Sequence, residues 1–238
     1  MRPIKTVSKI SWQDDKRTEK ATTAVSLLHI FLPLLTIHRS LLSSHTNIDM
    51  RIVVAITGAS GVIYGVRTLE VLHHCGVEVE LIVSKTAQKI LEMETGKRIE
   101  DLKPLCRHLY SEDDLLSPLS SGSYPTDGMV IVPCSMRTLA CIAHGISDNL
   151  IRRAAEVALK EGRKLVVVPR EAPLSQIHLE NMLSLKRAGA IILPACPGFY
   201  HRPTSIQELI DFVVGKILEV FEIPHQLYHG WKGESAHS

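Results

Sequence analysis

Several short loops in this sequence carry side chains that could bind an anion or move a proton. Each follows a short apolar run, and they read T-G-A-S-G at 57–61, S-K at 84–85, P-C-S-M-R-T at 133–138, P-R-E at 169–171 and P-G-F-Y-H at 197–201. Hydroxyl and guanidinium groups are donors that suit phosphate oxygens, and a carboxylate can accept a proton. These residue types indicate a site for a small molecule with at least one phosphate.

The glycine loop at 57–61 separates an apolar, β-branched run from residues with helical spacing. Strand, glycine loop and helix together present backbone N–H groups and a helix N-terminus to a phosphate. The same arrangement also serves as an ordinary strand–helix turn. Moreover, Gly58, Gly61 and Gly65 lack the G-x-G-x-x-G spacing of a dinucleotide site. The loop therefore indicates phosphate without identifying the molecule that carries it.

The elements that must position these loops alternate along the chain from Met50 onward. Apolar runs predict strands at 52–56, 77–83, 128–132, 165–168 and 190–193, with helices between them and a last helix at 205–221. Residues 95–127 predict only a short strand or helix and a long surface loop. Such alternation is typical of a doubly wound parallel α/β sheet, flavodoxin-like or Rossmann-like. Residues 50–238 are expected to form a single domain, with the ligand beyond the carboxyl ends of the strands.

Some of the predicted helices are preceded by side chains that are typical N-caps and so indicate where those helices begin. Ser84 and Ser175 are expected to be N-caps, and Ser147 with Asp148 is expected to cap the helix that follows. His178 is expected to cap or pack, and Cys134 to pack as a small residue. The acidic run at 112–114 is expected to be a solvated loop.

Composition and charge exclude several classes of protein. The formal net charge of +2 and the scattered basic residues give no nucleic-acid footprint. Five cysteines without a C-x-x-C pair indicate neither a zinc knuckle nor a disulfide framework, and they suit a reducing cytoplasm.

Residues 1–49 do not share the pattern of the rest. Their apolar stretch, 24–37, is interrupted by His29 and Pro33 and is shorter than the roughly 20 residues that span a bilayer. Because the stretch is too short to span a membrane, no membrane partner is expected. No clean signal-peptidase site follows it either. The segment is predicted to be an extension outside the fold, translated from an upstream start, with a targeting segment as the alternative.

Seven sequence blocks occur in order and carry a family resemblance: TGASG, SK…ExET, SSGS, PCSxxTL, NLIxRAA–VALKE, PREAPxxxxHLENM and PGFYHRP. With them, residues 50 to about 231 resemble the UbiX/Pad-type flavin prenyltransferases. The resemblance implies a flavodoxin-like fold, a homo-oligomer (a dodecamer) and a site formed between subunits. It implies metal-independent transfer of a dimethylallyl group from dimethylallyl monophosphate to N5 and C6 of reduced FMN. The prenylated FMN would serve a UbiD-type decarboxylase.

The resemblance also implies roles for individual residues. The FMN-binding residues would be Gly58, Ala59, Ser60, Ser84, Ser135, Met136, Arg137, Thr138 and Arg170. The residues that bind dimethylallyl phosphate would be Arg153, Lys160, Tyr200, Lys216 and Trp231. The catalytic carboxylates would be Glu94 and Glu171. Lys216 stands where the family usually has an arginine, and a lysine lacks the two-point grip on phosphate, so a weaker hold on the donor is expected.

The residues alone support this chemistry. Two lysines, an arginine and a tyrosine can neutralise a departing phosphate without Mg²⁺, and no D-D-x-x-D motif of metal-dependent prenyl transfer is present. Ring closure at C6 requires loss of a proton, which Glu171 can accept. An ion pair between Glu171 and a neighbouring subunit is the structural alternative.

Three other functions compete with this one. A flavin-dependent cysteine decarboxylase would carry P-x-M-N-x-x-M-W, and the nearest segment, 178–182, lacks the proline and the tryptophan. A short-chain dehydrogenase would need glycine at position 62, where this chain has Val62. Its catalytic Y-x-x-x-K could only be Tyr228 and Lys232, which lie after the last predicted helix and so do not fit that site. A non-catalytic FMN-binding or chaperone role stays open.

Overall fold

The structure, a computed structural model, describes residues 49–231. The predicted extension therefore lies outside the described residues except for Asp49. The first strand begins at Arg51, directly after Met50, as the sequence predicts.

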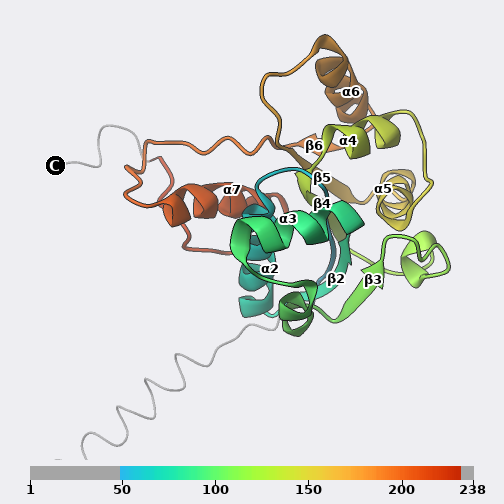
Figure 1. Ribbon diagram of the computed structural model, residues 1–238, viewed down its shortest axis with the longest axis horizontal. Coiled ribbons are helices and arrows are strands. Elements are labelled where there is room, and N and C mark those ends of the chain that lie inside the picture. Colours follow the sequence, from blue (N-terminus) through green and yellow to red (C-terminus); the bar gives the residue numbers. More distant parts are fainter. Residues whose placement is uncertain (1–48, 232–238) are drawn as a thin grey trace, which may run out of the picture. The chain divides into compact units, whose positions relative to one another are not determined.

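Six parallel strands form one sheet in the order β3-β2-β1-β4-β5-β6 (Figure 1). The strands are β1 (Arg51–Ile56), β2 (Glu78–Val83), β3 (His108–Ser111), β4 (Gly128–Cys134), β5 (Lys164–Pro169) and β6 (Ile191–Ile192). All five predicted strands are present, and β3 adds a sixth within the stretch of weak pattern. The chain builds outward from β1 to β3 and then returns to place β4 on the other side of β1. The order therefore reverses between β1 and β4, and ligands bind at such a switch point in open α/β sheets.

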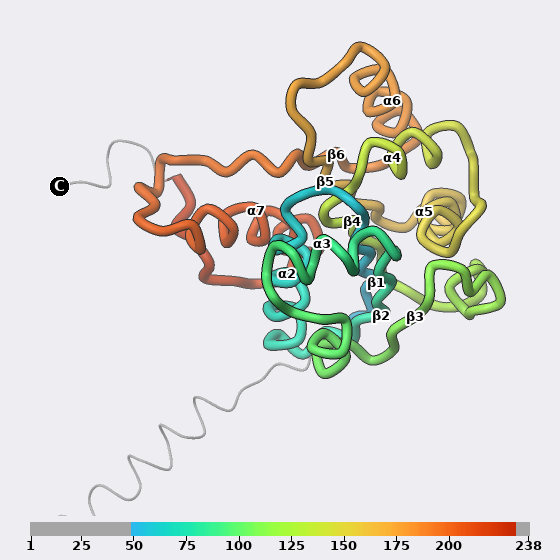
Figure 2. Tube along the Cα trace, viewed as in Figure 1, coloured from blue at the N-terminus to red at the C-terminus, as the bar shows by residue number. Residues whose placement is uncertain are grey.

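Helices cover both faces of the sheet. They are α2 (Val62–His74), α3 (Lys85–Thr95), α4 (Met136–Ala143), α5 (Leu150–Lys160), α6 (Gln176–Arg187) and α7 (Ile206–Val220), with 3₁₀ turns η1 (Ile99–Leu105) and η2 (Pro118–Ser120). Helices α2, α3 and α7 pack on one face, and α4, α5 and α6 pack on the other (Figures 1 and 2). Among residues 49–231, no helix is long and apolar enough to cross a bilayer.

Strand β1 shows why both layers are needed. Ile52, Val54 and Ile56 pack into the core on the α2 side, and Val53 and Ala55 pack into the core on the α4 side. Successive side chains of a strand point to opposite faces. Because helices cover both faces, the strand is apolar throughout instead of alternating apolar and polar residues.

Side-chain caps begin most of the helices. Ser84 and Ser175 accept hydrogen bonds from Ala87 and His178 N–H, as predicted. The predicted cap of α5 is wrong: Asn149, not Ser147 or Asp148, caps this helix by accepting from Arg152 N–H. Ser147 instead bonds Glu156, and Asp148 pairs with the buried Arg152.

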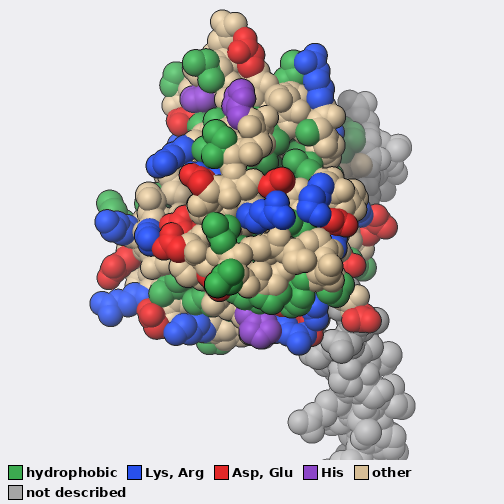
Figure 3. Space-filling model, turned by 90° about the vertical axis from the view of Figure 1, so that its right-hand side faces the viewer, with side chains coloured by type: hydrophobic (Ala, Val, Ile, Leu, Met, Phe, Trp, Pro, Cys, Tyr) green, Lys and Arg blue, Asp and Glu red, His purple; other side chains and the backbone are tan. Residues whose placement is uncertain are grey.

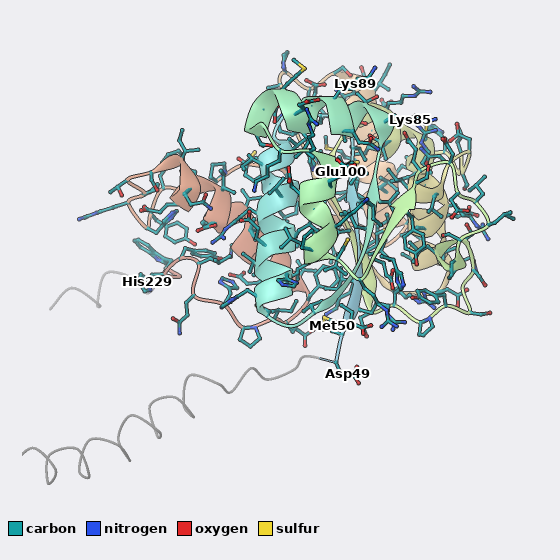
Figure 4. The ribbon with its side chains drawn as sticks, turned by 60° about the horizontal axis from the view of Figure 1, so that its bottom comes forward. Asp49, Met50, Lys85, Lys89, Glu100 and His229 are labelled. Atoms are coloured by element: carbon teal, nitrogen blue, oxygen red, sulfur yellow. The ribbon has the colours of Figure 1, made fainter. Side chains whose placement is uncertain are left out.

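The polar loops singled out in the sequence lie at one end of the sheet. Met50 precedes the amino end of β1 and Lys85 follows the carboxyl end of β2, and Figure 4 shows them at opposite ends. The loops singled out in the sequence follow the carboxyl ends of the strands, so they share the end at which Lys85 lies.

Candidate functional site

The loops after β1 and β4 are joined at the switch point by one buried side chain. Thr57, 1% exposed, donates from Oγ1 to the Pro133 carbonyl at 2.8 Å and accepts from Ser135 N–H at 2.7 Å. Its own N–H also donates to Pro133 at 3.2 Å. The sequence placed Thr57 in the glycine loop but gave no sign that its hydroxyl links two loops.

The loops after β2 and β5 approach the same glycine loop. A Cβ at Gly58 would lie 2.6 Å from Cγ2 of Thr86 at the start of α3, so only glycine allows this approach. From the other side, Arg170 donates from Nε to the carbonyl of Ser60 at 3.0 Å. The structure thus brings together the predicted FMN-binding residues of four separate loops.

The hydroxyls at this end can still donate to a ligand. Ser84 Oγ accepts from Ala87 N–H at 3.1 Å through a lone pair, and its own proton is not used in that bond. Ser135 Oγ accepts from Thr138 N–H and donates to Thr138 Oγ1 at 3.0 Å, which leaves the Thr138 proton for another acceptor. Met136 and Arg137 form the first turn of α4. This donor set suits a phosphorylated ligand such as FMN.

Glu94 has a role that its position in the sequence does not reveal. Helix α2 begins at Gly61, which has no side chain to serve as a cap. The Glu94 carboxylate, from the last turn of α3, accepts from Gly61 N–H at 2.9 Å and from Val62 N–H at 3.1 Å. A carboxylate at a helix N-terminus is favourable, so Glu94 caps α2 and fixes the glycine loop.

The acidic run at 112–114 is only partly a solvated loop. Asp113 and Asp114 are exposed, but Glu112 accepts from Lys85 N–H at 2.6 Å and from Asn149 Nδ2 at 3.0 Å. Glu112 therefore bridges the starts of α3 and α5, and the expectation of a solvated loop is wrong for this residue.

Glu171 lies beside Arg170 and faces solvent. Its carboxylate accepts from the N–H of Ala172 at 3.0 Å. The side chain is exposed, so its second oxygen is accessible to a ligand or to another subunit. This placement is compatible with the role of proton acceptor.

The predicted donor-binding residues fall into two groups, of which the first lies on α5. Arg153 donates from Nε to the Ser120 carbonyl at 3.0 Å and pairs with Glu156, and Lys160 pairs with Glu161. Lys160 precedes β5, whereas Arg170 follows it. The six residues of β5 span about 20 Å. Within one chain, Lys160 therefore lies at the opposite end of the sheet from Arg170.

The second group forms an aromatic cluster made of Tyr200, His201, Phe212, Tyr228 and Trp231. The ring of Tyr200 lies 6.0 Å from that of Trp231 and 5.7 Å from that of Phe212, and Phe212 lies 4.8 Å from Tyr228.

Lys216 extends from α7 toward this cluster. Its Nζ lies 5.5 Å from the Tyr228 ring centre and 5.9 Å from that of Phe212. The structure thus brings Lys216 into the same cluster as Tyr200 and Trp231. Sequence reasoning missed Phe212 as a member, and it considered Tyr228 only as part of a dehydrogenase motif.

Two side chains set aside in the sequence behave as expected. Cys134 is completely buried, and burial raises the pKa of its thiol, so it packs as a small residue. The Nδ1 of His178 accepts from Ser175 N–H at 3.3 Å and completes a capping box. In the part of the chain that the structure describes, no group of three or more His, Cys, Asp or Glu side chains could hold a metal ion.

Replacing Ser60 and Ser84 together with Ala is expected to weaken FMN binding by about 2 kcal/mol, roughly 30-fold. Each lost hydrogen bond is worth about 1 kcal/mol, and more when its acceptor is charged. Fluorescence titration of the apoprotein with FMN measures this. Because Ser84 is also a helix cap, Ser175→Ala is the matched control, since it removes a cap from α6 alone. An unchanged FMN dissociation constant in the double variant would place the phosphate elsewhere.

Comparison with known proteins shows the family to which this chain is related. The sequence profile of the Flavoprotein family matches residues 40–221. A flavin prenyltransferase UbiX of Methanocaldococcus jannaschii is 50% identical over 182 residues, 76% of this chain and 98% of that protein. The crystal structure of AnUbiX (PadA1) in complex with FMN and dimethylallyl pyrophosphate matches with a TM-score of 0.76 and 45% identity, covering 78% of this chain and 98% of that one. The crystal structure of a dodecameric FMN-dependent Ubix-like decarboxylase from Escherichia coli O157:H7 matches with a TM-score of 0.76 and 44% identity. This match covers 77% of this chain and 100% of that one.

Proposed function

From the premise that this chain belongs to the Flavoprotein family and, within it, to the flavin prenyltransferases, we propose that it transfers a dimethylallyl group from dimethylallyl monophosphate to N5 and C6 of reduced FMN. The observation that carries the proposal is the convergence of four loops on the β1–β4 switch point, joined by Thr57 and by Arg170. The high identity to flavin prenyltransferases favours this activity over that of a cysteine decarboxylase, a dehydrogenase or a purely binding protein.

The carboxyl end of the sheet supplies the groups that would hold FMN. Reduced FMN supplies the N5 and C6 atoms to be alkylated. The hydroxyls of Ser84 and Thr138 would donate to its phosphate, and Arg170 supports the glycine loop through the Ser60 carbonyl. Glu94 keeps that loop in place by capping α2.

Cationic and phenolic side chains would stabilise the departing phosphate. Lys216 and Tyr200 of the aromatic cluster would supply two of these groups, and Arg153 and Lys160 of α5 would supply the others. Charge neutralisation by such groups lowers the barrier to loss of an allylic phosphate. Glu171 would then accept the proton lost from C6.

The position of Lys160 supports a site that is complete only in an assembly. Because Lys160 lies at the other end of β5 from Arg170, a donor held near the Arg170 of one copy would meet the Lys160 of another. Helix α6 also exposes apolar side chains, with Ile177 66% and Leu179 52% exposed. On the face in Figure 3, charges of both signs are interspersed with apolar side chains. We therefore infer a homo-oligomer, and specifically a dodecamer like the relative of known structure.

The destination of the product and its compartment follow from the same proposal. The prenylated FMN is proposed to serve a UbiD-type decarboxylase. All five cysteines lie in the described part of the chain and are free thiols, which supports a reducing cytoplasm.

A chain that begins at Met50 is expected to fold and to bind FMN like the full chain, because residues 1–49 are proposed to be an extension outside the domain 50–238. Strand β1 begins only at Arg51. Thermal unfolding and FMN content of the two chains, purified in parallel, test this. Loss of FMN-loaded protein on truncation would assign a structural role to the extension.

Release of phosphate tests the activity itself. Under anaerobic conditions, the purified protein is expected to release inorganic phosphate from dimethylallyl monophosphate only when reduced FMN is present. Oxidised FMN is the matched control, since it lacks the nucleophilic reduced ring. Phosphate release that is independent of flavin would indicate a phosphatase instead.

A further inference from the structure

Lys216 is already paired in the structure. Its Nζ lies 2.8 Å from Oε2 of Glu219, one turn further along α7. The other carboxylate oxygen of Glu219 accepts a hydrogen bond from the hydroxyl of Tyr228. Lys216, the cation proposed to bind the donor phosphate, is therefore already engaged by the Glu219 carboxylate. The Tyr228 hydroxyl in turn holds that carboxylate in place.

Close packing around Gly215 creates this arrangement. A Cβ at Gly215 would lie 2.5 Å from Cε1 of Tyr228 and 2.8 Å from Cε1 of His225. Only glycine therefore lets the segment that follows α7, residues 222–231 (the tail), lie directly on this helix. The Nε2 of His225 lies 3.8 Å from the Glu219 carboxylate, and the side chain of His225 is 10% exposed. Glu219 is thus held by residues from two segments, unlike an isolated surface ion pair.

Charge is balanced within this group. The hydrogen bonds to Glu219 and Tyr228 raise the pKa of Lys216. Burial favours a higher pKa for Glu219, but the hydrogen bonds from Lys216 and Tyr228 outweigh it and the pKa is lowered. Burial and the bond to Glu219 raise the pKa of Tyr228 to about 12. At neutral pH the ammonium therefore faces a full negative charge.

We propose that Glu219 is a specificity-determining residue for the prenyl donor, because it competes with the donor phosphate for Lys216 and repels phosphate in proportion to its charge. Tyr228 is the positioning residue that keeps the carboxylate beside the ammonium. This inference depends on the proposed function, which places the donor phosphate at Lys216. A diphosphate carries more negative charge than a monophosphate, so Glu219 disfavours the diphosphate donor more strongly.

The surroundings of Glu219 allow this competition to be reversible. An open cavity of about 430 Å³, lined by Glu219, Tyr228 and His225 among others, lies between the end of α7 and the tail. The side chains of Lys216 and Glu219 are 40% and 45% exposed. The carboxylate can therefore turn into solvent when a phosphate takes its place on Lys216.

Glu219→Gln is expected to lower the dissociation constant of dimethylallyl monophosphate about 3- to 10-fold, more than an exposed ion pair alone would give, because repulsion of the phosphate is also removed. The decrease should be larger for dimethylallyl diphosphate. Calorimetric titration of the FMN-loaded full chain with each compound measures both values independently of turnover. The FMN affinity should stay unchanged, which separates an effect on donor binding from an effect on folding.

Two further variants test whether the effect passes through Lys216. In a Lys216→Met background, Glu219→Gln should tighten donor binding less than it does in the wild type, because the shared cation is gone and only the repulsion of the phosphate is relieved. Glu222→Gln is the matched control: it removes a carboxylate from the same end of α7, but this carboxylate pairs with Lys164. It should change the dissociation constant less than 2-fold. Tyr228→Phe should give part of the Glu219→Gln effect.

The outcomes separate this inference from the proposed function. If the wild-type protein makes prenylated flavin but Glu219→Gln binds both donors no more tightly, the inference is overturned and the function stands. Equal tightening in the Lys216→Met background would also overturn it. If the wild-type protein binds neither donor and releases no phosphate, the proposed function fails, and the assignment of Lys216 fails with it.

Discussion

Glu171→Gln is expected to bind FMN normally and to form the ring-closed prenylated flavin about 10²- to 10⁴-fold more slowly, the usual contribution of a general base. Glutamine keeps the size of the side chain, and its carbonyl can still accept from Ala172 N–H, so the loop should keep its shape. What is lost is the ability to accept a proton. Loss of phosphate depends instead on the cations and on Tyr200, so it should be affected less.

Rapid mixing of the reduced protein with dimethylallyl monophosphate, followed by flavin absorbance and mass, measures this change. Glu180→Gln is a matched control, because Glu180 is also exposed and its carboxylate accepts from Gln176 Nε2 on the same helix. Ring closure at the wild-type rate would show that Glu171 is not the base. The released phosphate would then be a better candidate for the base than Glu94. The Glu94 carboxylate already accepts hydrogen bonds from the Gly61 and Val62 N–H groups at the start of α2.

Thr57→Val is expected to lower the free energy of unfolding by about 1–3 kcal/mol and to weaken FMN binding as well. Valine has the shape of threonine but cannot accept from Ser135 N–H, and a partly buried N–H without a partner costs that much. The Pro133 carbonyl still accepts from the N–H of residue 57, so only one partner is lost completely. In a protein of this size, each kcal/mol lowers the melting temperature by about 2–4 °C.

Thr68→Val is the matched control for this prediction. Thr68 is also fully buried, but its hydroxyl bonds the Tyr64 carbonyl within a single helix turn. Urea unfolding of the two variants, with and without FMN, compares them directly. Equal losses of stability, with FMN affinity intact in both, would mean that the Thr57 link between loops is not important to the site.

The sequence predicts most of the fold because its signals are local. Apolar runs mark the strands, and serines such as Ser84 and Ser175 bond N–H groups only three residues away. Strand β3 lacks such a run, because it lies at the edge of the sheet and its residues are exposed or half-buried. The cap of α5 was misplaced because Ser147, Asp148 and Asn149 are all good N-cap residues, and tertiary contacts decide among them.

Contacts between distant residues could not be predicted. Glu94 is 33 residues from Gly61, and nothing near it in sequence indicates that it caps α2. The contact of Tyr228 with Glu219 depends on how the tail crosses α7 at Gly215. By contrast, the separation of Lys160 from Arg170 could have been predicted from the sequence. Lys160 precedes strand β5 and Arg170 follows it, so the two residues must lie at opposite ends of the strand.

The mass of the flavin after reaction tests the central claim most directly. The full chain is loaded with FMN, reduced under anaerobic conditions and incubated with dimethylallyl monophosphate, and the flavin is then extracted and analysed by mass spectrometry. We expect the flavin mass to increase by one five-carbon prenyl unit, in step with phosphate release. Recovery of unmodified FMN beside intact donor would contradict the assignment as a flavin prenyltransferase.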